Sequence, residues 1–219
     1  MHDVWDVRAG KKLGFPSVTT VLGMVSKPGL EYWKREWAVL TADSNRREEN
    51  EDPKDYFKRV EKIFNSSNKA ADIGKMLHKF AEYRGSPLIV GYEDICGKIA
   101  KWQEENLGRG IAEESFAYTD LRIGGTIDWY GYDVNGNKTL VDWKSQKPKD
   151  GKLTFYKSWR GQLAAYSKGE TSIRHISVVF SSDPKEPLLE WREYTKEEVK
   201  EALEYFLACR TVWEFENND

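Results

Sequence analysis

The chain is predicted to fold as an α/β (α+β) protein, with a mixed central sheet flanked by helices and a mainly helical N-terminal region. Two observations support this prediction. Residue patterns through the first half of the chain are mostly helical. From residue 111 onward the pattern changes to three strands, a helix, two strands and a final helix, an order typical of an α/β core.

The first half is expected to contribute helices. After a short hairpin-like start, Pro16-Ser17 opens a helix that runs to Val25, with Ser17 as its N-cap. The polar segment 43–55 carries many charges and Pro53, which predicts a loop. Further helices are predicted over residues 30–42, 56–64, 69–83 and 92–106. Residues 1–109 therefore form the helical region of an expected single domain, 1–219.

The second half is expected to form the core, residues 110–219. Strands are predicted over residues 111–118, 122–132 and 138–143, and Asn135-Gly136 is a strong hairpin signal between the last two. Thr195 and Glu198 have capping-box spacing and open a last helix that runs to about Trp213. Between these parts we expect a helix over 155–168 and strands over 173–181 and 188–194.

Composition excludes several classes of protein. No apolar run approaches the ~20 residues that span a membrane, and the N-terminus lacks the apolar stretch of a signal peptide, so we expect a cytoplasmic, intracellular protein without a membrane partner. Cys96 and Cys209 have no metal-binding spacing, which argues against a cysteine-ligated zinc ion or an iron–sulfur cluster. The net charge of −2 does not indicate a nucleic-acid partner, although a local basic groove would be sufficient for one.

Two carboxylates are predicted to lie side by side on neighbouring strands. Asp128 and Asp142 flank the hairpin, and Mg²⁺ prefers such oxygen ligands while keeping waters for a substrate phosphate. Lys144 shares the face of Asp142, where its ammonium could orient the attacking water or stabilise charge on the phosphate. Taken alone, D-x-K on a strand is more often a solvated face with an ion pair. The surrounding motifs favour a site.

Five motifs in order resemble the RecB-like branch of the PD-(D/E)XK nucleases. They are G-x-x-x-H (Gly74 to His78), a strand glutamate (Glu114), G-T-I-D (Gly125 to Asp128), V-D-W-K (Val141 to Lys144) and Q-x-x-x-Y (Gln162 to Tyr166). The segment P-S-V-T-T-V-L, residues 16–22, is similar to the start of a subgroup that includes phage exonucleases and the mitochondrial genome maintenance exonuclease. The resemblance implies a restriction-endonuclease-like core and a metal-dependent DNA exonuclease of replication, recombination or repair, with a phage as one suggested source.

The resemblance also implies roles for single residues. Asp128 and Asp142 would be the principal ligands of one or two Mg²⁺ or Mn²⁺ ions, the Trp143 carbonyl a further ligand, and Lys144 the catalytic lysine. Glu114 would be the acidic residue of the first strand, because it shares strand parity with Phe116 and Tyr118. The neighbouring Glu113 remains open as an alternative.

The remaining implied residues each have a plain structural alternative. His78 would be a metal ligand or substrate contact, but its helix also fits a histidine at the edge of the core. Gln162 and Tyr166 would face the active site and DNA, although an isolated Q-x-x-x-Y is ordinarily an amphipathic helix. Arg160 is a candidate phosphate contact or simply a surface arginine. Ser145, Gln146 and Lys147 are candidate contacts along the phosphate path.

Aromatic residues on the N-terminal helices have two interpretations. In the subgroup, helices before the core form a clamp over single-stranded DNA, where rings stack on bases; helical spacing more often indicates packing. Trp33, Trp37, Tyr56 and Phe57 are the candidates. His2 and His175 are expected to be structural or exposed. Two other functions remain open: a structure-specific endonuclease, and a non-catalytic DNA-binding module that keeps the nuclease fold.

Overall fold

The computed structural model describes residues 5–6, 11–12, 14–25, 28–66 and 69–217. The chain divides into two compact units. The first, here called the sheet unit, comprises residues 1–25 and 74–219; the second, the helical-pair unit, comprises residues 26–73. The two units meet in the chain after residues 25 and 73, so the helices between residues 74 and 106 belong to the same unit as the sheet.

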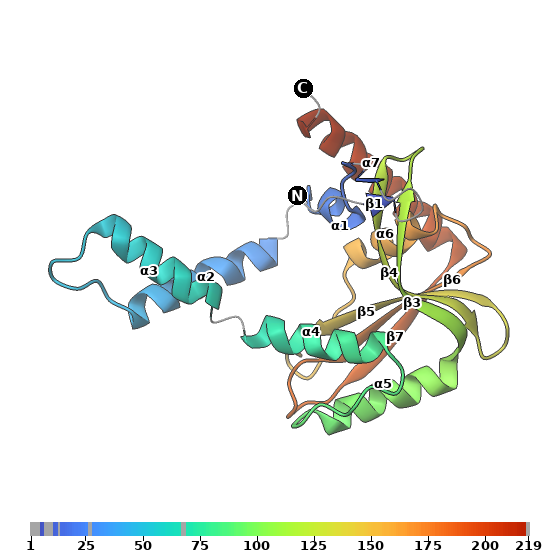
Figure 1. Ribbon diagram of the computed structural model, residues 1–219, viewed down its shortest axis with the longest axis horizontal. Helices are drawn as coiled ribbons and strands as arrows, with labels where there is room; N and C mark the ends of the chain where they lie inside the picture. The colour runs from blue at the N-terminus through green and yellow to red at the C-terminus, as the bar shows by residue number, and fades with distance from the viewer. Residues whose placement is uncertain (1–4, 7–10, 13, 26–27, 67–68, 218–219) are drawn as a thin grey trace. The chain divides into compact units, whose positions relative to one another are not determined.

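The sheet unit is built on a five-stranded mixed sheet in the order β3-β4-β5-β6-β7 (Figure 1). Neighbouring strands are antiparallel except β5 and β6, which are parallel. The strands are β3 (Leu107–Tyr118), β4 (Ile123–Asp133), β5 (Lys138–Gln146), β6 (Arg174–Ser181) and β7 (Leu189–Tyr194). The predicted mixed α/β architecture with flanking helices is confirmed. In addition, β1 (Trp5–Asp6) and β2 (Lys11–Lys12) form the hairpin expected at the start of the chain.

Helices cover both faces of this sheet (Figure 1). On one face, α1 (Val18–Leu22), α6 (Lys157–Tyr166) and α7 (Lys196–Asn217) enclose the main apolar core, in which Val21, Leu163 and Phe206 are fully buried. On the other face, α5 (Glu93–Asn106) packs Trp102 edge-on against Trp143, with ring centroids 5.3 Å apart. The remaining helix of this unit, α4 (Lys69–Glu82), carries the G-x-x-x-H motif from residue 74 onward.

Local sequence signals account for several ends of these elements. Ser17 caps α1 by accepting the N–H of Thr20 at 3.0 Å, but the helix ends at Leu22 and not at Val25, because Gly23 forms its C-cap. The capping box of α7 is confirmed: the Thr195 N–H donates to the Glu198 carboxylate, and the Glu198 N–H donates to the Thr195 hydroxyl.

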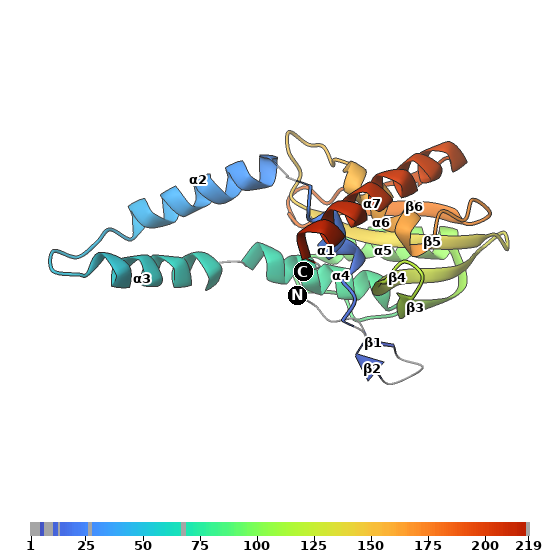
Figure 2. The ribbon, with the colours of Figure 1, turned by 90° about the horizontal axis from the view of Figure 1, so that it is seen from above.

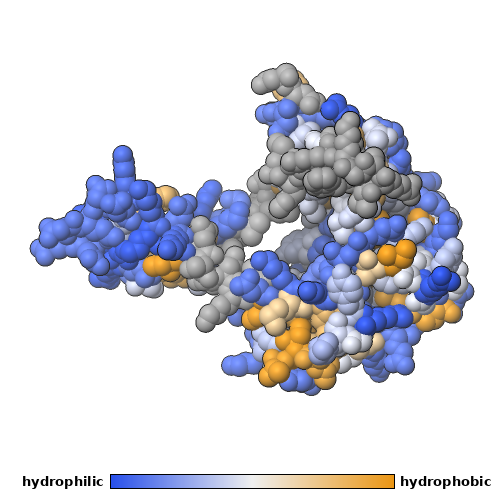
Figure 3. All heavy atoms as spheres, in the orientation of Figure 1, coloured by the Kyte–Doolittle hydropathy of each residue, from blue (hydrophilic) through white to orange (hydrophobic). Residues whose placement is uncertain are grey.

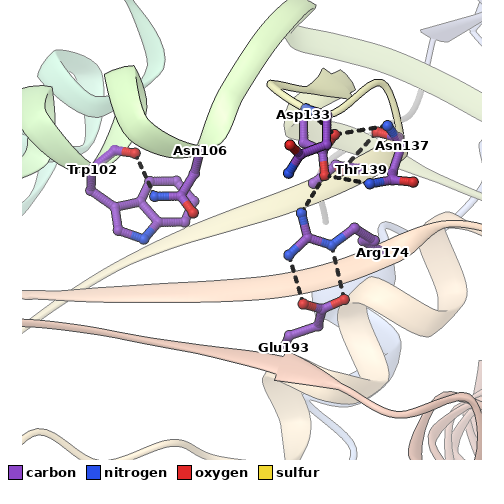
Figure 4. Close-up of polar contacts among 8 residues, drawn as sticks. Trp102, Asn106, Asp133, Asn137, Thr139, Arg174 and Glu193 are labelled. Atoms are coloured by element: carbon purple, nitrogen blue, oxygen red, sulfur yellow. Dashed lines mark hydrogen bonds and ion pairs between the residues drawn. The ribbon is translucent and has the colours of Figure 1, made fainter.

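The turn between β4 and β5 is held by the buried carboxylate of Asp133 (Figure 4). This carboxylate accepts the backbone N–H groups of Asn135 and Asn137 at 2.9 and 2.7 Å, while Gly136 adopts a φ of 84°. Arg174 then joins Asp133, at 2.5 Å, to Glu193 on β7, at 2.7 and 2.9 Å. One arginine thus ties the turn to the two following strands.

The helical-pair unit consists of α2 (Pro28–Ser44) and α3 (Pro53–Ser66) with the segment that connects them (Figure 2). The helix α3 begins inside the predicted loop because proline suits the first position of a helix. The Tyr56 hydroxyl donates to the Ala42 carbonyl at 3.1 Å, and Arg59 makes two 2.8 Å bonds to Glu51. These contacts hold the two helices and their connection together.

On the face of the sheet unit seen in Figure 3, apolar residues gather over α4 and the segment that joins it to α5. A hollow of about 600 Å³ lies there, lined among others by Met76, Phe80, Tyr83 and Ile89. Along the described parts of the chain, no helix combines the length and the apolar character that crossing a membrane requires.

Candidate metal centre

The backbone pairing of β4 and β5 ends just before Asp128 on β4 and Asp142 on β5. The last paired residues are Trp129 and Val141. Beyond this pair, a side-chain bond takes the place of the backbone hydrogen bonds between the strands. The Asp128 Oδ2 accepts the Trp143 N–H at 2.8 Å. Asp128 is thereby fixed against the backbone of β5, next to the strand segment that carries Asp142.

Asp142 and Lys144 form a buried pair on β5. The Lys144 Nζ lies 2.6 Å from Asp142 Oδ1, so the predicted sharing of one strand face is confirmed. Asp142 is fully buried, and its Oδ2 has no hydrogen-bond partner among the described residues. Burial raises the pKa of Asp142, an effect that the neighbouring Lys144 opposes. The second oxygen of this carboxylate is the strongest indication of a cation site, because an unsatisfied buried carboxylate oxygen is costly.

The α4 residue His78 directs its ring toward the same place. Its Nε2 lies 2.9 Å from the Trp143 carbonyl oxygen and 3.3 Å from Asp128 Oδ2. Its Nδ1 lies 2.5 Å from Glu82 Oε1. Burial alone would lower the pKa of His78, but the bonds to Asp128 and Glu82 raise it to about 10. The ring is therefore a cation when no metal ion replaces its Nε2 proton.

Gly74 explains how α4 comes this close to β5. A Cβ atom added at residue 74 would lie 2.7 Å from the Ser145 hydroxyl oxygen, well inside normal contact distance. A glycine four residues before His78 thus removes the atom that would meet β5. The G-x-x-x-H spacing has a packing reason here as well as a chemical one.

The β3 strand directs Glu113, and not Glu114, toward this cluster. Glu114 pairs with Ile127 and Ala112 pairs with Trp129, so Glu113 falls opposite Asp128. Burial and the carboxylates of Glu82 and Asp128 raise the pKa of Glu113. The alternation of side chains along the strand correctly places Glu114 on the same face as Phe116 and Tyr118. That face, however, is the one that carries Ile127 and not Asp128. The geometry therefore favours the alternative residue for the acidic position of the first strand.

Glu82 is the one member of the cluster that the sequence motifs did not indicate. It lies four residues after His78 on the same helix, and its side chain is only 9% exposed. The i, i+4 spacing of a histidine and a glutamate on one helix face was the available signal. His78, Glu82 and Asp128 can bring one ligand atom each to within 4.8 Å of the others.

The residues of this cluster fit a divalent cation. In an octahedral site with bonds of about 2.1 Å, neighbouring ligand atoms lie about 3.0 Å apart, and Nε2 of His78 has such spacings to the Trp143 carbonyl and Asp128. Carboxylate and carbonyl oxygens suit Mg²⁺, whereas an added imidazole is better suited to Mn²⁺. Asp142 is not one of the three residues whose ligand atoms lie within 4.8 Å of one another, although the charges of Asp128 and His78 act on its carboxyl group.

Gln162 and Tyr166 are both buried on α6 and bond to each other, with Gln162 Nε2 donating to the Tyr166 hydroxyl at 2.6 Å. Burial and the charges of Asp142 and Asp128 raise the pKa of Tyr166 well above its usual value. The charges of the two carboxylates therefore act on Tyr166, which also belongs to the main apolar core.

The candidate DNA contacts have different surroundings. Arg160 is bound to Glu198 and Glu201 of α7, which makes it a link between helices. The Gln146 side chain bonds the backbone of Thr154. Ser145 lies against α4, and Lys147 is exposed. Of these four residues, only Lys147 is free of such internal contacts.

The other histidines and the N-terminal aromatics lie outside the cluster. His175 is buried on β6, with its Nε2 2.7 Å from the Ser167 hydroxyl, in keeping with the expected structural role. His2 and the side chain of Trp33 lie outside the described part of the chain. In the helical-pair unit Trp37 and Tyr56 are half-buried, and Phe57 is exposed. Base stacking by these rings remains a prediction.

Comparisons with known proteins add little to this geometry. No family model matches the chain, and no curated protein matches it. Among solved structures, one described as "Crystal structure of SSO0001" aligns with 87% of this chain and 93% of its own, at 13% sequence identity and a TM-score of 0.34. A similarity of that size carries no argument about function. What the site does must therefore be inferred from its own residues.

Proposed function

We propose that the protein is a metal-dependent DNA nuclease of the PD-(D/E)XK type, an exonuclease of the RecB-like branch that prefers single strands or free ends. One observation carries the proposal: His78 Nε2 lies 2.9 Å from the Trp143 carbonyl and 3.3 Å from Asp128. On the same strand as Trp143, the buried Asp142 pairs with Lys144 through Oδ1, while its Oδ2 has no partner among the described residues. The order of the five motifs along the chain supports the same function.

In this proposal Asp128, Asp142, His78 and the Trp143 carbonyl hold Mg²⁺ or Mn²⁺, and Glu113 supplies the acidic residue of β3 in place of Glu114. When bound, the ion supplies Lewis-acid stabilisation of the phosphate and lowers the pKa of a coordinated water. The Oδ1 of Asp142 holds the Lys144 ammonium, which stabilises the negative charge that develops on the phosphate during in-line attack. The products are a 5′-phosphate and a 3′-hydroxyl.

The test is hydrolysis of single-stranded DNA with Mg²⁺. Asp142→Asn and Lys144→Ala should each abolish degradation, while circular dichroism shows the wild-type fold. Lys185→Ala, at an exposed lysine elsewhere on the sheet unit, should retain full activity. Full activity in Asp142→Asn or Lys144→Ala would overturn the proposal.

Two further measurements separate the related functions. A circular single strand must survive an obligate exonuclease, so its digestion would indicate an endonuclease. Calorimetry with Mn²⁺ separates an enzyme from a non-catalytic DNA-binding module, because a module with a broken pocket binds no ion.

A further inference from the structure

The segment that joins β5 to α6, residues 147–156, and the first residue of α6, Lys157, together carry a concentration of positive charge. We call residues 147–157 the basic loop. Lys147, Lys149, Lys152 and Lys157 are all exposed, and none makes an ion pair with any residue that the structure describes. Asp150 is the single acidic residue of the loop, so its local charge is +3 in a chain of net charge −2. By contrast, Arg160, Lys168, Arg174, Arg192 and Arg210 are all paired with carboxylates.

The basic loop is held in a defined shape. The Gln146 side chain accepts the Thr154 N–H at 2.7 Å and donates to the Thr154 carbonyl at 3.1 Å. Lys149 and Lys152 exchange backbone hydrogen bonds of 3.0 and 3.1 Å across a turn in which Asp150 and Gly151 have φ values of 51° and 69°. Because these hydrogen bonds already hold the loop in shape, ligand binding does not carry the full entropic cost of ordering the loop.

The loop also presents an aromatic ring. Tyr156 is 54% exposed, and its ring packs edge-on against Trp159, with centroids 4.9 Å apart and planes at 90°. Phe155 supports Trp159 from a centroid distance of 6.4 Å. An exposed ring that is held in place by its neighbour is the kind of platform on which an unpaired base stacks.

Both ends of the basic loop join elements of the candidate metal centre. Lys147 follows Lys144 by three residues, a backbone distance of at most about 11 Å. At its other end the loop enters α6, which carries Gln162 and Tyr166. In Figures 1 and 2 the segment lies beyond the end of β5, on the side from which α6 starts. A strand lying on the loop at Lys147 would therefore be within about 11 Å along the backbone of Lys144.

We propose that the basic loop binds a single nucleic-acid strand next to the metal centre, with its lysines on consecutive phosphates and Tyr156 under a base. This inference rests on the proposed function, whose substrate it places. Lysines interleaved with an aromatic ring fit the alternating phosphates and bases of such a strand. A membrane surface fits less well, because no aliphatic side chain of this fully described segment is exposed for insertion into lipid.

The test is binding of a fluorescein-labelled single-stranded oligonucleotide, measured by anisotropy in EDTA so that hydrolysis cannot intervene. One variant replaces Lys147, Lys149, Lys152 and Lys157 by Gln. Its matched control makes the same charge change at four exposed lysines elsewhere, Lys98, Lys138, Lys185 and Lys200. The loop variant should bind at least about 10-fold more weakly and lower the slope of log K against log salt by about 3, since each phosphate contact on a single strand contributes about 0.7.

The aromatic platform is tested separately. Tyr156→Ala should weaken binding by about 5-fold or more, the effect of losing one stacked base, whereas Tyr156→Phe should bind as the wild type does. Equal losses in the loop variant and its control, or no loss in the loop variant, would overturn the proposal. Loop-dependent binding to phosphatidylserine vesicles without binding to the oligonucleotide would also overturn it.

The outcomes distinguish this inference from the proposed function. Wild-type protein that binds the oligonucleotide through the basic loop but never hydrolyses it with Mn²⁺ would refute the nuclease and leave the loop proposal standing. If the loop variant bound the oligonucleotide with wild-type affinity and hydrolysed it at the wild-type rate, the loop proposal would be refuted. The nuclease proposal would still stand.

Discussion

The imidazole of His78 and the carboxylate of Glu82 lie one helical turn apart on α4, with Nδ1 and Oε1 separated by 2.5 Å. This bond fixes the plane of the ring, so that Nε2 faces the Trp143 carbonyl and Asp128. Histidine ligands of metal ions commonly donate their other ring N–H to such a carboxylate, which orients the ring and makes it a stronger ligand. Glu82 is therefore a positioning residue for His78.

Glu82→Gln should weaken Mn²⁺ binding by about 10- to 100-fold, as removal of such partners does elsewhere. Calorimetry measures the affinity, and Glu104→Gln, at an exposed position of α5, provides the matched control. The ring of His78 would have no role in ion binding if Glu82→Gln and His78→Ala both bound Mn²⁺ as the wild type does.

A comparison of two adjacent glutamates tests the β3 register. Glu113→Gln should lower Mn²⁺ affinity and DNA hydrolysis by about 10-fold or more, because Glu113 lies opposite Asp128. Glu114→Gln should change both by less than about 2-fold, because its partner across the strands is Ile127. The reverse order of effects would restore Glu114 to the acidic position.

The buried Asp133–Arg174 pair is expected to stabilise the fold without affecting the chemistry. Asp133→Ala leaves two turn N–H groups without their acceptor and leaves the Arg174 guanidinium with Glu193 as its carboxylate partner, and the loss of these bonds should cost about 1–3 kcal/mol of unfolding free energy. Asp120→Ala, which removes an exposed pair with Lys168, should cost at most about 1 kcal/mol. Urea unfolding measures both values. A similar small loss for both variants would show that the Arg174 network contributes little.

The buried imidazole of His175 predicts a loss of stability in mild acid. Burial lowers the pKa of His175 to about 4, whereas a histidine in an unfolded chain has a pKa of about 6.5. Above pH 6.5 both states are neutral and the imidazole contributes no pH dependence. As pH falls from about 6.5 toward about 4, only the unfolded state takes up this proton, so stability should decrease by up to about 1.4 kcal/mol per pH unit.

Urea unfolding of wild type and His175→Gln at several pH values between about 4 and 7 isolates this contribution, because carboxylates affect both proteins alike. The difference in unfolding free energy between the two proteins should shrink as the pH falls. A difference that is constant with pH would mean that the pKa of His175 is the same in the folded and unfolded states.

Much of this fold could be predicted because its signals are local. The hairpin at Asn135-Gly136, the N-cap at Ser17 and the capping box at Thr195 depend on neighbouring residues, and the structure has each of them. Strand parity correctly placed Lys144 beside Asp142. These features need no knowledge of how distant segments meet.

What the sequence could not provide depends on register and on distant contacts. Parity groups alternate residues of a strand, but only the pairing with β4 decides that Glu113, and not Glu114, lies opposite Asp128. Arg160 had the charge for a phosphate contact, yet its carboxylate partners come from α7, about forty residues later. The division of the chain at residue 73 likewise follows from contacts that no local pattern encodes.

The bond from the Trp143 N–H to the Asp128 carboxylate bears on how the proposed ion would bind. With Asp128 held by the backbone of β5 and Asp142 held by Lys144, both carboxylates are in place before any ion arrives. Folding and loading are then separate events, unlike those of small domains that collapse only around their metal. A chelator should stop the chemistry within the time of ion release and leave the chain folded, so that adding Mn²⁺ restores activity without refolding.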